Sequence, residues 1–149
     1  MGISLQARLA KIPWPRTWAG WARLYCQATI LFAAQGVLLL AIYAVRGFDT
    51  NPDSLPLGLQ LDPRHAVIHL LFGIIGAAIG FWQPEGAVPF TVFFGLFYIT
   101  LAIFGTFTPI HFGMQLLLPE NALHWTLGTL AAVVGLAALL APRRRGARA

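Results

Sequence analysis

Pro63-Arg-His-Ala-Val-Ile-His69-Leu-Leu-Phe-Gly73 and Pro119-Glu-Asn-Ala-Leu-His124-Trp-Thr-Leu-Gly128 are two similar stretches, and each opens a long apolar segment. Each stretch places a histidine about one turn inside its segment, with a glycine four residues later. A histidine inside a membrane is costly unless another group satisfies its ring. The two stretches therefore bear on both the fold and the function.

The composition is typical of an integral membrane protein. Of 149 residues, 58% are hydrophobic and only 10% are charged, which excludes an ordinary soluble domain. Four apolar runs approach or exceed the roughly 20 residues that a helix needs to cross a bilayer. We therefore predict an all-α fold in which four transmembrane helices form one bundle. The predicted spans are residues 24–45, 66–82, 88–107 and 123–141.

The distribution of basic residues predicts the orientation of these spans. Four of the ten basic residues precede the first span, four follow the last, and two lie in the loop after the first span. By the positive-inside rule both termini are cytoplasmic, in a bacterial inner or intracytoplasmic membrane. Residues 1–23 then form a cytoplasmic interfacial segment and residues 142–149 a basic cytoplasmic tail. We expect both to attract anionic lipid rather than nucleic acid.

The two histidine stretches also suggest an internal repeat. His69 and His124, Gly73 and Gly128, and Ala77 and Ala132 are all separated by the same offset of 55 residues. This pattern favours a duplicated two-helix unit whose copies are parallel. The alternative is chance similarity between apolar helices.

Small residues in the spans predict close helix packing, because helices in lipid associate by close approach of their backbones. We expect spans two and four to meet each other or a partner through such residues. An alternative for Gly73 and Gly128 is that they make room for a flat macrocycle held by the histidine one turn earlier. The other predicted packing residues are Gly76, Gly80, Gly95, Gly105, Ala132 and Gly135.

The predicted topology places all four histidines at the outer end of the bundle. His65 and His69 are four residues apart and so share one helix face, a spacing that suits two ligands of one metal ion. His124 is a candidate third ligand, and Glu120 or His111 a candidate fourth. Imidazole ligands suit zinc, copper or iron.

Two other interpretations of the histidines remain open. His69 and His124, at similar depth on different spans, are candidate axial ligands of haem or chlorophyll. Alternatively, the histidines clamp helix ends together through hydrogen bonds and bind no cofactor, or they relay protons. The chain lacks a Cys-x-x-Cys-His haem attachment site.

Other polar residues suggest no catalysis. Asp62-Pro63 is typical of a helix start, since aspartate caps well and proline suits the first helical position; Pro119-Glu120-Asn121 begins the fourth span in the same way. Cys26, the single cysteine, is expected to be a packing residue. The apolar loop at residues 107–119 is expected in the outer interface or as a cap on the bundle. Mid-span polarity is too sparse for a transporter path: Gln35, Thr91, Thr100 and Thr126.

The sequence from Leu61 to Gly73 resembles a bacterial four-span membrane family known as a domain of unknown function, DUF4383. Its members read Val-Asn-Pro-x-His-Asn-x-x-His-Leu-x-x-Gly before span two and Asn-x-x-His-x-x-x-Gly before span four. The segment from Asn121 to Gly128 fits the second motif, whereas Asp62 and Ala66 replace two asparagines of the first. The resemblance covers roughly residues 24–141. It implies the four-span fold and draws attention to the histidines of both motifs, but it implies no activity.

From these observations we predict a non-catalytic accessory or structural membrane subunit, packed with other subunits in a larger complex of photosynthetic or respiratory type. Its default state carries no cofactor. The alternative function is a membrane protein that binds haem, chlorophyll, zinc or copper through the outer histidine cluster.

Overall fold

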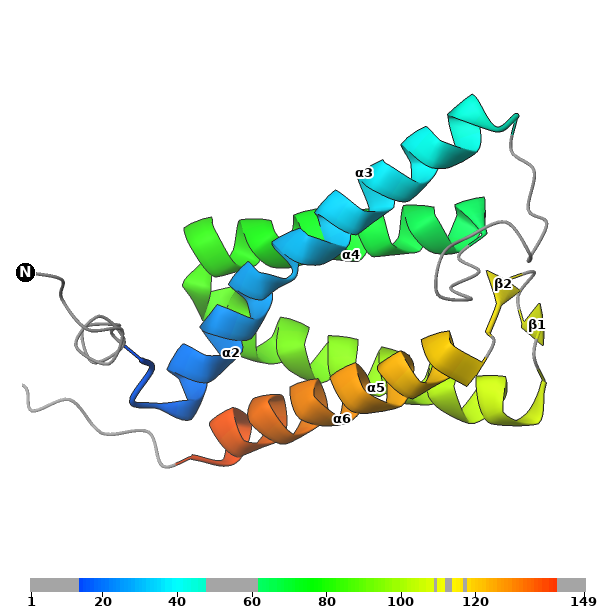
Figure 1. Ribbon diagram of the computed structural model, residues 1–149. Helices are drawn as coiled ribbons and strands as arrows, with labels where there is room; N and C mark the ends of the chain where they lie inside the picture. Colours follow the sequence, from blue (N-terminus) through cyan, green and yellow to red (C-terminus); the bar gives the residue numbers. More distant parts are fainter. Residues whose placement is uncertain (1–13, 48–61, 109, 112–113, 117, 142–149) are drawn as a thin grey trace, which may run out of the picture.

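The computed structural model describes residues 14–47, 62–108, 110–111, 114–116 and 118–141. Within these residues four helical segments are long and apolar enough to cross a membrane, so the predicted all-α, four-span fold is confirmed. The first span comprises two helices, and a 3-10 turn, η3 (Pro84–Gly86), connects the second and third spans. The helices, in chain order, are α2 (Trp18–Ala28), α3 (Ile30–Val45), α4 (Pro63–Trp82), α5 (Ala87–Phe107) and α6 (Leu118–Leu140) (Figure 1).

The helix of the first candidate span begins at Trp18, earlier than the predicted residue 24. The side chain of Thr17 caps this start by accepting a hydrogen bond from the backbone of Gly20. Arg23 is accommodated inside the span because its Nε donates to the carbonyl oxygen of Gly80 at 2.9 Å. Residues 1–13 and the basic tail at 142–149, predicted to contact anionic lipid, lie outside the described residues.

Helix α4 begins as the sequence predicted. Asp62 is its N-cap, and its carboxylate accepts hydrogen bonds from the backbone N–H groups of Arg64 and His65 at 2.9 and 3.1 Å. Pro63 is the first helical residue, where its missing N–H costs nothing. This start fixes how far His65 and His69 lie inside the helix.

The pairing of the helices differs from the prediction. The small residues of spans two and four do not pack against each other. Instead α4 packs against the first span and α6 packs along α5, which gives two helical hairpins (Figure 1). A methyl group at Gly73 would collide with the backbone nitrogen of Ala33 in α3, and one at Gly95 would lie 2.5 Å from that of Ala132 in α6. The small residues therefore bring each span against its neighbour in sequence.

The loop after α5 contains two short strands, β1 (Ile110–His111) and β2 (Met114–Gln115), paired antiparallel. Two apolar side chains of this loop, Met114 and Leu116, are buried. The side chain of Leu116 fits against Gly105 near the end of α5. These contacts agree with the expectation that the apolar loop caps the bundle.

Candidate metal centre

Three of the histidines predicted from the sequence meet in the interior of the bundle. His65 and His69 lie one turn apart on α4, and His124 comes from α6. All three are buried, and each offers one ring nitrogen such that the three nitrogens lie within 4.8 Å of one another. Separate helices thus present three imidazoles to one point.

His65 and His124 join α4 to α6 directly. Their Nε2 atoms are 3.3 Å apart, and the ring centroids are 5.2 Å apart. Two neutral imidazoles at this distance share one hydrogen, so one ring donates from Nε2 and the other accepts. In this protonation state the hydrogen bond joins α4 to α6. This is the clamp between helix ends that was one of the interpretations left open by the sequence.

His69 is held in one tautomer by Gln35 of α3. Its Nδ1 is 3.1 Å from Oε1 of Gln35. An amide oxygen only accepts, so Nδ1 carries the hydrogen and Nε2 of the neutral ring keeps a lone pair. This Nε2 is buried without a hydrogen-bond partner among the described residues. A neutral imidazole whose other nitrogen donates to an oxygen is the usual form of a metal-ligating histidine.

The spacing of the nitrogens also suits a metal ion. With metal–nitrogen distances of about 2.0–2.1 Å, two imidazole nitrogens on a tetrahedral zinc ion lie about 3.3–3.4 Å apart. The Nε2 atoms of His65 and His124 already have this separation. Binding would require the donating ring to move its hydrogen to Nδ1, after which both Nε2 lone pairs face the ion.

The other predicted ligands are placed differently. Glu120 is buried and lines the cavity beside His124, outside the close group of three. The side chain of His111 is outside what the structure describes. Methyl groups at Gly73 and Gly128 would touch the backbones of Ala33 and Ile99. In this packing neighbouring helices fill the space that a macrocycle would need beside either glycine.

Two residues of the site received no role in the sequence analysis. Tyr98 of α5 lies near the rings of both His69 and His124, with centroid distances of 6.2 and 5.2 Å. The sequence feature that could have indicated Tyr98 is its spacing of four residues from Phe94. The two rings stack with their centroids 4.2 Å apart. Gln35 was noted only as sparse mid-span polarity.

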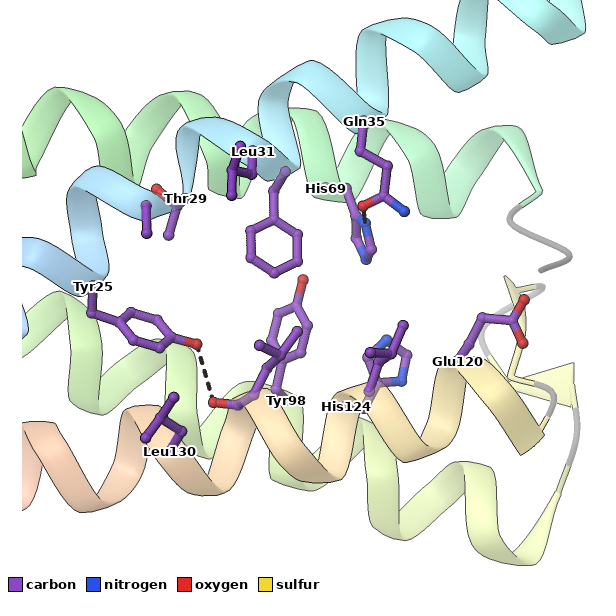
Figure 2. A pocket seen from close by; sticks show the side chains of 13 residues that line it. Tyr25, Thr29, Leu31, Gln35, His69, Tyr98, Glu120, His124 and Leu130 are labelled. Carbon is purple, nitrogen blue, oxygen red and sulfur yellow. Dashed lines mark hydrogen bonds between the residues drawn. The ribbon is translucent and has the colours of Figure 1, made fainter. Parts of the chain in front are cut away.

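A cavity of about 420 Å³ adjoins the histidines, between the first span and α6. Figure 2 shows Gln35 and His69 on one side of this space and His124 and Glu120 on the other, with Tyr98 pointing across it. Most of the remaining lining residues are apolar. The histidine cluster and the cavity therefore form one continuous site.

Comparison with known families finds one match: the model of a family described as a domain of unknown function, DUF4383, covers residues 21–137. The matched range contains α3, α4 and α5 in full, α2 without its first three residues and α6 without its last three, and it includes the three buried histidines. Neither the curated proteins nor the solved structures contain a match to the chain.

The hydrogen bond between His65 and His124 predicts a measurable coupling in protein freed of metal by a chelator. We expect His65→Leu or His124→Leu alone to lower the free energy of unfolding by about 1–3 kcal/mol, because each leaves a buried imidazole nitrogen unpaired. In the double variant the loss of unfolding free energy should be smaller than the sum of the two single losses, with a coupling energy of about 1 kcal/mol. Detergent-induced unfolding followed by thiol labelling of Cys26, which is fully buried, measures these values.

Thr100→Val is the control for this cycle, since the exposed Thr100 hydroxyl bonds only within its own helix, to Leu96. It should change stability little and should show no coupling to His65→Leu. Strictly additive effects of the two histidine substitutions would contradict the clamp.

Proposed function

The chain belongs to the DUF4383 family, and we propose that this multi-pass membrane protein binds one transition metal ion through His65, His69 and His124. The observation that carries the proposal is the close approach of three buried ring nitrogens, all within 4.8 Å of one another. We assign the protein a binding role and no catalytic step.

The chemistry of the donors narrows the choice of ion. Three neutral imidazoles suit zinc or copper better than magnesium or calcium, which prefer oxygen ligands. Gln35 supports His69 in the way that second-layer groups orient metal ligands. A single ion also fits the adjoining Nε2 atoms of His65 and His124 better than a macrocycle does, because a macrocycle would have to separate those rings.

Three protein ligands leave one position of a tetrahedral ion open. His69 and His124 both line the cavity, so this open position would face it. The site therefore combines a metal ion with space for a further ligand, and an ion held only for structural reasons would not need that space.

We further infer that the site lies at the extracytoplasmic side of a bacterial inner or intracytoplasmic membrane. Basic residues favour cytoplasmic termini, and α4 then begins outside at Pro63 and ends inside at Trp82. The metal would enter from the outer side.

Metal content tests the proposal. Protein purified in detergent, stripped with a chelator and reloaded with Zn²⁺ or Cu²⁺ should hold about one ion per chain by elemental analysis. His65→Ala, His69→Ala and His124→Ala should each lose most of it, because two remaining imidazoles bind weakly.

Asn121→Ala is the matched control for these variants. Asn121 is a buried polar residue on α6, as His124 is, but its amide donates to Thr106 and it is not part of the close group. This variant should keep the ion. A wild-type protein that retains no more metal than the three histidine variants would rule the site out.

The orientation is tested by the reactivity of introduced thiols in intact cells. Arg64 and Glu85 are both exposed, at opposite ends of α4, and the native Cys26 is buried. A membrane-impermeant maleimide should label Arg64→Cys in intact cells and should label Glu85→Cys only after lysis. The reverse pattern would place the histidines on the cytoplasmic side.

A second proposal keeps the accessory role predicted from the sequence, in which the chain packs with other membrane subunits. Large apolar side chains are exposed on every span, and Val45, Trp82 and Leu118 are the most exposed on theirs. Lipid and a partner would cover such faces equally well, so the metal site ranks first. A stoichiometric second subunit after mild solubilisation would support the accessory role, and a protein that is always alone would contradict it.

A further inference from the structure

The cavity beside the histidines opens sideways into the membrane. Its rim includes Leu31, Leu123 and Leu130, which are 70%, 47% and 51% exposed on spanning helices. Its floor includes Tyr98 and His124, which are 1% and 2% exposed. Because the exposed faces of spanning helices meet hydrocarbon, a molecule that enters between α3 and α6 must come from the lipid phase.

The floor of this cavity holds a hydroxyl group that the protein leaves without a partner. The hydroxyl of Tyr98 is buried and has no hydrogen-bond partner among the described residues. The second tyrosine of the cavity differs, because the hydroxyl of Tyr25 donates to the carbonyl oxygen of Leu127 at 3.0 Å. Figure 2 shows this bond and shows the Tyr98 hydroxyl pointing toward the first span. Buried hydroxyls are nearly always bonded, so Tyr98 indicates an acceptor that arrives with a ligand.

The remaining lining restricts the chemistry of that ligand. Glu120 lies at one end of the cavity. Its carboxyl group disfavours a ligand with an acidic head group, because two carboxylates close together repel each other. A cationic head would face the imidazoles of His69 and His124. The rings of Phe32 and Tyr98, with centroids 6.1 Å apart, offer aromatic walls to a flat ring. The volume of about 420 Å³ lies within the usual range of small-molecule sites.

We propose that the cavity binds a neutral, lipid-soluble carbonyl compound of the quinone type, which enters between α3 and α6 and accepts a hydrogen bond from the hydroxyl of Tyr98. The apolar tail of such a molecule lies along the rim leucines, and its ring lies beside Phe32. This inference goes beyond the metal site and does not require it. Tyr98 and the leucines of the rim are not among the proposed metal ligands.

Photolabelling of the full-length protein in lipid nanodiscs tests the inference. The probe is a benzoquinone whose alkyl tail carries a diazirine, and unlabelled decyl-benzoquinone and decylbenzene are the competitors. We expect saturable labelling of α3 and α6 that decyl-benzoquinone suppresses and decylbenzene does not. Tyr98→Phe should raise the concentration of decyl-benzoquinone needed for half-suppression about two- to tenfold, the loss of one neutral hydrogen bond.

Tyr25→Phe is the matched control, because it removes an equivalent hydroxyl that is already satisfied inside the protein. It should leave the affinity for decyl-benzoquinone unchanged. Leu31→Trp narrows the mouth at an exposed position and should abolish the labelling. Equal suppression by decylbenzene would show an acyl-chain groove and overturn the proposal, as would unchanged affinity in Tyr98→Phe. Metal content measured on the same samples keeps a failed metal site distinct from a failed cavity.

Discussion

Hydrocarbon offers no hydrogen bond, so every polar group inside the span must find its partner within the protein. Several polar side chains here do so against backbone carbonyl oxygens of the helices. Arg23 and Gln27 both donate to Gly80, and Thr29 bonds where the first span passes α4. Exceptions among the described residues include Nε2 of His69, Nδ1 of His124 and the hydroxyl of Tyr98, which are buried without hydrogen-bond partners and all belong to residues that line the cavity.

The same packing that binds the helices together creates this cavity. Small residues draw α3 onto α4 and α5 onto α6, closely enough that a methyl group would collide with the facing backbone. The two hairpins meet at α2, which contacts both α5 and α6, whereas α3 diverges from α6 toward its C-terminal end (Figure 1). The histidines of α4 and α6 bridge the hairpins, and the cavity forms beside them. Packing and site are therefore consequences of one arrangement.

The sequence was sufficient to predict where helices begin and which residues share a helix face. It was insufficient to predict which helices pack against each other. Asp62-Pro63 determines where α4 begins, and helical periodicity alone places His65 and His69 on one face. Gly73 and Gly95 indicate a close contact, but a small residue does not specify which helix approaches it. The alternative in which spans two and four meet each other was therefore wrong. Tyr98 went unassigned for a similar reason. Within a run of aromatic residues, only the three-dimensional neighbours distinguish a packing ring from one that presents a hydroxyl to a cavity.

A clamp between α4 and α6 explains two of the three histidines and leaves the third without a purpose. The bond between His65 and His124 is complete with those two rings. His69 adds nothing to it, yet Gln35 holds its ring so that an acceptor nitrogen is buried without a hydrogen-bond partner among the described residues. An apolar side chain at that position would avoid the unpaired nitrogen at no expense to the clamp. The proposed ion, at the point where the three nitrogens converge, would accept a lone pair from each of them. It would lie on the wall of the cavity that also contains the unpartnered hydroxyl of Tyr98.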